Sequence, residues 1–197
     1  MKIFIATKNE DKKKEFLRIL SPYGFTVLTE KDLDRPLPET EETGSTFEEN
    51  AMLKAQTGLK ATGLITVADD SGLCVDALNG EPGVYSARYA GGHGDSAANN
   101  AKLLEKLKNV PDEKRTARYK VAIACVFPDG RSFTVSGCCE GKIGTAPQGN
   151  GGFGYDPLFI SEIGCFGNVA PELKDSVSHR GKAIKAFKNE LKKYIDL

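Results

Sequence analysis

Short apolar runs and stretches with apolar residues at helical spacing alternate along the chain. Residues 2–6 are a nearly continuous apolar run, typical of a buried strand, and residues 10–21 carry an apolar stripe with helical period. Beyond residue 116 two β-rich runs flank the turn 128–130, which is typical of a hairpin. The pattern predicts strands over 2–6, 25–29, 64–68, 73–77, 117–127, 131–140 and 157–161, and helices over 10–21, from 45–46 to 63, over 95–109 and over 180–195.

The helix that opens at 45–46 has the clearest end signals. A capping box is satisfied either by Ser45 with Glu48 or by Thr46 with Glu49. Gly63 is the expected C-terminal stop, because glycine adopts the left-handed conformation that ends many helices. Acidic side chains in the first turn of this helix are expected to interact with the helix dipole.

The order of elements, β-α-β, α-β, hairpin and α, favours an α/β domain with a mixed sheet over a purely parallel one. The 197 residues suffice for a single domain over 1–197, built as two tightly joined lobes. This size also supports a buried core.

Charge and hydropathy exclude several classes of protein. The 27 basic and 27 acidic side chains give a formal net charge of zero, which disfavours a protein that wraps nucleic acid. The longest apolar run, 121–127, falls far short of the roughly 20 residues of a membrane span. Charged residues follow the first apolar run too early for a signal peptide. We therefore expect a cytoplasmic protein that binds neither membrane nor nucleic acid.

The five cysteines are odd in number and lack C-x-x-C spacing, which favours free, mostly buried thiols. Cys138 and Cys139 are neighbours in a predicted strand, so their side chains point to opposite faces. A structural zinc site is therefore not expected there.

Paired carboxylates mark the first candidate site. Asp69 and Asp70 follow an apolar strand directly, in a predicted loop, where they repel each other unless a cation or hydrogen-bond donors compensate. They indicate a metal site or an acid/base pair, and the structural alternative is a turn or helix-cap cluster. The acidic loop 30–44 offers Glu41 or Glu42 as a further oxygen ligand for magnesium.

A glycine-rich segment, 149–156, is the second candidate site. It satisfies G-x-G-x-x-G by count but leads into a strand, so it is not a dinucleotide-binding fingerprint. The segment is either a donor-rich loop whose exposed aromatic residues stack on a base or a glycine bulge between strands.

Candidate cations for phosphate binding lie at the N-termini of two predicted helices. The strand-to-helix turn from Thr7 to Lys12 is of the type that presents backbone N–H groups to anions, whereas Lys13 and Lys14 are expected to be solvated. Lys174 and the segment 178–180 form a second cluster, and cations at a helix N-terminus are disfavoured by the helix dipole. A histidine N-cap is the alternative there, and a ligand contact fits better.

Six segments together resemble the XTP/dITP diphosphatase family, also called the inosine triphosphate pyrophosphatase family. They are Thr7-x-Asn9-x-x-Lys12, Glu42-Thr43-Gly44-x-Thr46-Phe47-x-Glu49-Asn50-Ala51, Ala68-Asp69-Asp70-Ser71-Gly72-Leu73, Pro82-Gly83-Val84-Tyr85-Ser86-Ala87-Arg88, Gly151-Gly152-Phe153-Gly154-Tyr155-Asp156-Pro157 and Ser178-His179-Arg180-Gly181. Each segment alone is weak. The probability that six segments occur by chance in the family's order, spread over nearly the whole chain, is very small.

The resemblance implies a cytoplasmic, Mg²⁺-dependent homodimer that hydrolyses ITP, dITP and XTP to the monophosphate and pyrophosphate. It implies an elongated mixed sheet flanked by helices, in two lobes with a nucleotide cleft between them. It implies Asp70 as general base, Glu42, Asp69 and Asp70 as metal ligands, and as substrate contacts Thr7, Lys8, Asn9, Glu10, Asp11, Lys12, Ser71, Phe153, Gly154, Tyr155, Asp156, Lys174, His179 and Arg180.

One departure from the family pattern is Lys8, where a small or uncharged residue is common. The alternatives are a related pyrophosphatase for other modified nucleotides, a nucleotide-binding module without turnover and a nucleic-acid-binding protein. Intact aromatic and His-Arg segments argue against the first alternative, and the pair Asp69 and Asp70 argues against the second. The zero net charge argues against the third.

Overall fold

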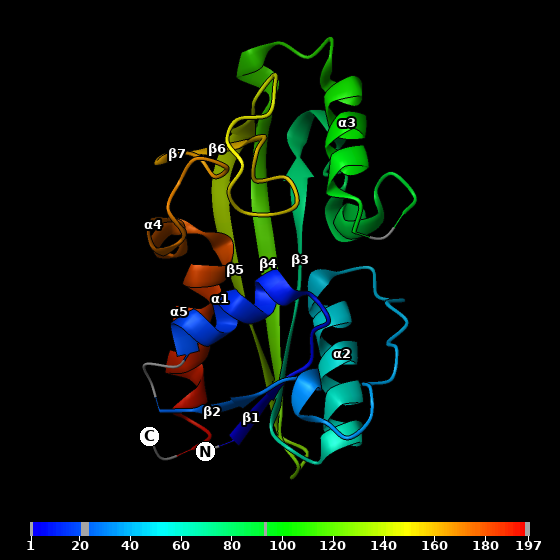
Figure 1. Cartoon of the computed structure of the whole chain (residues 1–197), viewed down its shortest axis with the longest axis vertical. Helices are drawn as coiled ribbons and strands as arrows, with labels where there is room; N and C mark the ends of the chain where they lie inside the picture. Colours follow the sequence, from blue (N-terminus) through cyan, green and yellow to red (C-terminus); the bar gives the residue numbers. More distant parts are fainter. Residues whose placement is uncertain (1, 21–23, 93, 196–197) are drawn as a thin grey trace. The chain divides into compact units, whose positions relative to one another are not determined.

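The computed structural model describes residues 2–20, 24–92 and 94–195, which fold into two compact units (Figure 1). We call Met1–Asp70, Val121–Gly137 and Gly181–Leu197 the first unit, and Ser71–Lys120 and Cys138–Arg180 the second unit. The chain passes from the first unit to the second between Asp70 and Ser71, and again between Gly137 and Cys138.

Over the residues that the structure describes, seven strands form one mixed sheet in the order β2-β1-β3-β4-β5-β6-β7. Strand β1 runs parallel to β2 and to β3, whereas β5, β6 and β7 pair antiparallel. The bounds are β1 Lys2–Ile5, β2 Thr26–Leu28, β3 Thr66–Val75, β4 Thr116–Val126, β5 Ser132–Ile143, β6 Phe159–Ser161 and β7 Gly164–Cys165. The predicted mixed α/β architecture is confirmed.

Five α-helices accompany the sheet in the described part of the chain: α1 Glu10–Leu20, α2 Phe47–Thr62, α3 Ser96–Leu107, α4 Pro171–Val177 and α5 His179–Leu191. Four of them match predicted helices; the predicted end of the first, residue 21, lies outside the described residues. Helix α4 was not predicted, because seven residues are too few to show a helical period. None of the helices in the described ranges is long and apolar enough to cross a membrane.

Strand β3 corrects the prediction of two short strands around a loop. It runs without interruption through Asp69, Asp70, Ser71 and Gly72. The aspartates are poor strand formers, but each forms an ion pair with a lysine from a helix. These tertiary contacts override the local turn preference that the sequence carries.

Helix α2 begins and ends as predicted. Thr46 is the N-cap and accepts a hydrogen bond from the Glu49 N–H at 3.2 Å, while Glu49 Oε2 accepts from the N–H groups of Ser45 and Thr46. The hydrogen bond from the Ser45 hydroxyl is the main cause of the lowered pKa of Glu49. Gly63 closes the helix at φ 68°. The second of the two capping boxes is thus the one that forms.

A stripe of small residues brings α2 close to the sheet. Ala51, Ala55 and Gly58 are buried on one face of the helix, and a Cβ on Gly58 would lie 2.7 Å from Thr66 Cγ2 and 2.9 Å from Ala6 Cβ. This close approach leaves no room for a larger side chain. It also sets neighbouring helix positions, which hold Asn50 and Lys54, beside β3.

Lys13 differs from its prediction as a solvated lysine. Its side chain is 6% exposed, and its ammonium pairs with Glu10 at 2.8 Å, whereas Lys14 is exposed as expected. A lysine can bury its aliphatic stem while its ammonium keeps a charged partner.

Candidate active site

Two carboxylates at the middle of β3 lie on opposite faces of the sheet. Val67, two residues before Asp69, belongs to the apolar cluster with Phe16 of α1, and Ala68, two residues before Asp70, belongs to the cluster with α2. Because side chains alternate along a strand, Asp69 faces α1 and Asp70 faces α2. The repulsion indicated by the sequence is relieved by this separation and by one lysine for each aspartate.

Each aspartate pairs with a lysine of the helix it faces. Lys12 Nζ lies 3.1 Å from Asp69 Oδ2, and Lys54 Nζ lies 2.7 Å from Asp70 Oδ1. Lys54 also donates to Glu42 Oε1 at 2.9 Å. One ammonium group therefore holds Glu42, from the acidic loop, and Asp70 together.

Burial raises the pKa of Asp70 above its ordinary value, and the charges of Lys54 and then Lys12 oppose that shift. Burial lowers the pKa of Lys54, but the charges of Asp70, Asp69 and Glu42 more than compensate, so the net shift is upward. Lys54 is thus protonated at neutral pH, beside a carboxylate that is more basic than an ordinary aspartate.

Asn50 connects the acidic loop with Asp70. It is fully buried, its Oδ1 accepts a hydrogen bond from the Gly44 N–H at 2.8 Å, and its Nδ2 donates to Asp70 Oδ2 at 3.4 Å. A Cβ on Gly44 would lie 2.7 Å from Asn50 Oδ1, so glycine is required for this approach. Asn50 therefore fixes the backbone of the acidic loop at Gly44, two residues after Glu42.

Asn50 and Lys54 were not among the predicted site residues. They lie in a helix whose acidic start has an ordinary capping role, and only Asn50 falls within one of the six segments that carry the family resemblance. The available signal was their position beside the small residues Ala51, Ala55 and Gly58, since such a stripe indicates close packing on a sheet.

The turn before α1 uses most of its backbone donors internally. Asn9 Oδ1 accepts from the N–H groups of Asp11 and Lys12, both at 3.0 Å, and Thr7 Oγ1 accepts from Asn9 N–H at 3.2 Å. These N–H groups are therefore not available to an anion in this conformation. A bound phosphate would depend chiefly on side-chain cations at this turn.

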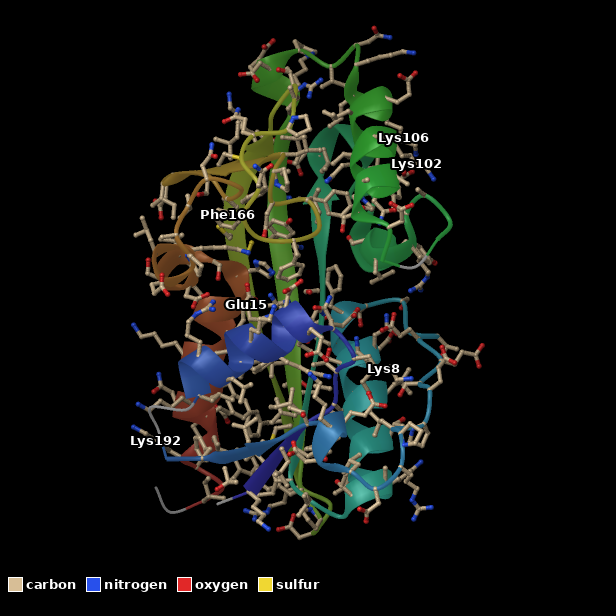
Figure 2. The ribbon with its side chains drawn as sticks, in the orientation of Figure 1. Lys8, Glu15, Lys102, Lys106, Phe166 and Lys192 are labelled. Atoms are coloured by element: carbon tan, nitrogen blue, oxygen red, sulfur yellow. The ribbon has the colours of Figure 1, made fainter. Side chains whose placement is uncertain are left out.

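Lys8 lies on this turn (Figure 2). It borders a pocket of about 430 Å³ in the first unit. Lys8 is exposed and forms no ion pair with any residue that the structure describes. The pocket lining also includes Lys13, Lys31 and Arg35, together with acidic Glu10, Glu30 and Asp34. Glu10 already pairs with both Lys13 and Lys31.

No group of three or more His, Cys, Asp or Glu side chains is arranged to hold a metal ion within the described ranges. Glu42 and Asp70 nevertheless converge on one cation, the Lys54 ammonium. Their hard carboxylate oxygens fit the donor preference of Mg²⁺. Asp69 belongs to the other face of β3, where Lys12 binds it.

In the second unit the glycine-rich segment curls around Asp156. Asp156 Oδ2 accepts a hydrogen bond from the Phe153 N–H at 2.8 Å. Gly152 has φ 71°, and a Cβ there would lie only 2.1 Å from that oxygen. Glycine is thus required at position 152 both for its backbone conformation and for the space that the carboxylate fills.

Charged side chains gather around Phe153. Lys174 Nζ lies 2.6 Å from Asp156 Oδ2 and 5.0 Å from the Phe153 ring centroid, and Arg180 Cζ lies 5.8 Å from the same centroid. Arg180 Nη2 also donates to Ser71 Oγ at 3.0 Å. The structure therefore brings together five of the predicted contact residues of this unit, and Lys174 and Arg180 are both buried.

The prediction that the aromatic residues of this loop are exposed is wrong for Tyr155. Its side chain is buried and its hydroxyl donates to the Ser86 carbonyl at 2.8 Å. Tyr155 anchors the loop to the core, which leaves the partly exposed Phe153 as the loop's aromatic surface. Gly154 is fixed through its carbonyl, which accepts from Asn100 Nδ2 at 3.0 Å.

His179 is the first residue of α5 and stacks on a tyrosine that the sequence analysis did not single out. Its ring centroid lies 4.7 Å from that of Tyr119, with the planes 11° apart. Tyr119 lies within β4, where its apolar neighbours gave it the pattern of an ordinary core residue.

Comparison with known proteins finds similarity over nearly the whole chain. Residues 3–190 match the family model of the Ham1 family. The dITP/XTP pyrophosphatase of Nocardia farcinica is 51% identical over 93% of this chain and 91% of its own length, and that of Geobacter sulfurreducens is 50% identical over 96% of both.

Solved structures show the same relationship. The Ham1 protein of Staphylococcus aureus aligns with a TM-score of 0.85 and 39% identity over 99% of this chain and 100% of that chain. A HAM1 protein from Coxiella burnetii aligns with a TM-score of 0.87 and 36% identity, over 98% and 99% of the two chains.

Proposed function

The chain belongs to the Ham1 family, and from this premise we propose that it hydrolyses the deaminated purine nucleoside triphosphates ITP, dITP and XTP to the monophosphate and pyrophosphate. The relatives named dITP/XTP pyrophosphatase support this substrate class. In the structure, the observation that carries the proposal is Lys54 bridging Asp70 and Glu42. A protein that only bound nucleotides would gain nothing from carboxylates beside a triphosphate.

Asp70 is assigned as the general base. Burial makes its carboxylate more basic than usual, which favours accepting a proton from a water molecule aimed at the α-phosphorus. Asn50 and Lys54 hold the two Asp70 oxygens and so fix the direction of proton transfer. Positioning of this kind supplies a large part of the rate in reactions of this class.

Lys12 and Lys54, which approach β3 from its two faces, are both assigned to the phosphate chain of the substrate. Each brings a positive charge toward the leaving pyrophosphate, where negative charge increases in the transition state. Magnesium, held by Glu42 and Asp70 when bound, would add further charge neutralisation at the phosphates. Lys8, which is exposed on the turn before α1, is a further cation assigned to the phosphates.

The second unit is assigned to the base. Phe153 offers a partly exposed ring for stacking on the purine. Lys174 and Arg180, with His179, supply donors that suit the 6-keto group of hypoxanthine and xanthine. The 6-amino group of adenine would present a donor to these donors, and an unpaired buried polar group is costly.

We also propose a cytoplasmic location and a homodimeric state. The zero net charge and the absence of a long apolar run support the first, and the family resemblance in the sequence supports the second. Light scattering behind size-exclusion chromatography distinguishes a dimer of the 21.3 kDa chain from a monomer.

The test of the proposed function is pyrophosphate release measured with ITP, dITP, XTP, GTP, ATP and dTTP, with Mg²⁺ and with a chelator. We expect strong preference for the three deaminated purines, dependence on Mg²⁺, and loss of turnover in Asp70→Asn. Lys60→Gln, which changes one exposed charge at the far end of α2, serves as the matched control with normal turnover. Equal rates for ITP and ATP would contradict the assigned substrate class.

A further inference from the structure

A side chain of helix α3 holds the backbone of the glycine-rich segment in the second unit. Asn100 Nδ2 donates a hydrogen bond to the Gly154 carbonyl at 3.0 Å, although the two residues lie 54 positions apart. Gly154 has φ 62°, and no atom beyond its chain neighbours lies within 4 Å of the position of a Cβ there. Packing on that side does not constrain the backbone, so the bond from Asn100 is what fixes it.

The neighbours of Gly154 are held by other groups. Asp156 Oδ2 accepts a hydrogen bond from the Phe153 N–H at 2.8 Å, and the Tyr155 hydroxyl donates to a core carbonyl at 2.8 Å. No side chain other than Asn100 bonds to Gly154 in the part of the chain that the structure describes. Asn100 therefore supplies the contact that fixes the segment between its two aromatic residues.

The Asn100 amide is oriented at a cost to stability. Its Oδ1 is buried and has no hydrogen-bond partner among the described residues. Turning the amide over would direct that oxygen at the Gly154 carbonyl oxygen, and two acceptors repel each other. An unpaired buried acceptor destabilises a folded protein. The bond to Gly154 is therefore kept although the other end of the amide is left without a partner.

The preceding residue is an asparagine with both ends of its amide bonded. Asn99 is buried, its Oδ1 accepts from the Ala90 N–H at 2.7 Å, and its Nδ2 donates to the carbonyls of residues 86 and 87, both at 3.4 Å. These bonds stabilise the turn before α3. Leucine has a higher helix propensity than asparagine and would leave no unpaired acceptor at position 100. Stability alone therefore does not account for Asn100.

The ring of Phe153 depends on the backbone that Asn100 holds. Lys174 Nζ lies 5.0 Å and Arg180 Cζ lies 5.8 Å from the ring centroid. In the proposed function the ring sets the plane of the purine, and these cations donate to its 6-keto group. A tilted ring would turn the 6-keto group out of line with its donors, whereas adenine has no such bond to lose. A displaced Gly154 would therefore weaken binding of ITP more than binding of ATP.

We propose that Asn100 is a positioning residue for base selection: by holding the Gly154 carbonyl it fixes the Phe153 ring in the plane that aligns the purine with Lys174 and Arg180. The inference deepens the proposed function and rests on it, because it concerns how that site distinguishes bases. Asn100 is not among the residues assigned to the phosphates. Its loss should therefore raise KM and lower selectivity more than it changes kcat.

The test is Asn100→Leu, with Ser161→Ala as the matched control. Ser161 is in the same unit and its Oγ donates to the Gly164 carbonyl at 3.1 Å, so each change removes one bond from a side chain to a glycine carbonyl. We expect Asn100→Leu to raise the KM for ITP about tenfold with kcat changed less than about twofold, and to lower the ITP-to-ATP ratio of kcat/KM about tenfold. Ser161→Ala should leave the KM and the ratio within about twofold of wild type.

Melting temperatures show whether the change acts on the site or on the fold. Asn100→Leu should melt within about 4 °C of wild type, because it removes the unpaired acceptor together with the donor. A double-mutant cycle then tests the route of the effect. In a Phe153→Leu background, Asn100→Leu should change the ITP-to-ATP ratio by less than about twofold, since it acts through the ring.

Three results would overturn the inference. The first is a folded Asn100→Leu variant with the KM and the ratio of wild type. The second is a variant that loses stability and kcat together, and the third is an undiminished effect on the ratio when the Phe153 ring is absent. A wild-type enzyme that does not prefer ITP over ATP would instead refute the proposed function.

Discussion

Gly152→Ala is the substitution whose consequences the structure specifies most closely. The residue has φ 71°, and its Cβ would lie 2.1 Å from Asp156 Oδ2 and 2.8 Å from Asp156 Cβ. A left-handed conformation costs a residue with a Cβ about 1–2 kcal/mol. The carboxylate would also have to retreat by more than about 1 Å to reach ordinary contact, because packed interiors leave no such overlap.

That retreat would weaken two buried interactions. The Phe153 N–H and the Lys174 ammonium both bind the oxygen that must move. Disrupting a buried ion pair costs about 3–5 kcal/mol, and this adds to the conformational cost. Gly154→Ala isolates the conformational cost, since Gly154 has φ 62° and nothing lies within 4 Å of its Cβ position.

Thermal unfolding of both variants separates the two contributions. A change of 1 kcal/mol shifts Tm by about 2–4 °C in a chain of this length, so we expect Gly154→Ala to lower Tm by about 2–8 °C. Gly152→Ala should lower it by more than about 8 °C and should also lose its preference for ITP over ATP. Equal melting temperatures for the two variants would show that the contact with Asp156 does not constrain this loop.

Two further predictions concern the charges of the first unit and a cysteine of the second. Lys54→Met should lower the free energy of unfolding by about 2–4 kcal/mol and abolish turnover, because it leaves Asp70 and Glu42 facing each other without their shared cation. Lys54→Arg keeps a cation between them and should recover the stability, as measured by denaturant titration. Burial, then a hydrogen bond to Glu140, raises the pKa of the Cys138 thiol to about 11. The rate of its alkylation at pH 8 should therefore be about 100-fold lower than that of a thiol with the ordinary pKa of 9.0. This rate should increase about tenfold per pH unit up to pH 10. Mass-spectrometric labelling rates measure this, and a rate independent of pH would contradict the account.

The parts of the fold that were predictable are those whose causes are local. The capping residues Thr46 and Glu49 and the stop at Gly63 act within one turn of their own helix, and each was found where expected. Strand β3 was predicted in two pieces, because the ion pairs that keep Asp69 and Asp70 in a strand come from helices distant in the sequence.

The candidate site was predicted only in part for the same reason. Lys54 and Asn50 lie 16 and 20 residues from Asp70, and only the packing of α2 on the sheet brings them together. Tyr155 was expected on the surface, where an aromatic residue of a glycine-rich loop stacks on a ligand. Its side chain is instead buried, and its hydroxyl donates a hydrogen bond to the Ser86 carbonyl. The stacking of His179 on Tyr119 carried no signal in the sequence, since the two residues lie 60 positions apart.

The central claim is that Asp70 directs water at the α-phosphorus of ITP. Its most direct test is turnover of ITP in ¹⁸O-labelled water, with the products separated and their isotopic masses measured by mass spectrometry. The account predicts label in the phosphate of IMP and unlabelled pyrophosphate, because Asp70 directs water at the α-phosphorus, and little product from ATP under the same conditions. Label in pyrophosphate, or release of IDP with labelled orthophosphate, would contradict it.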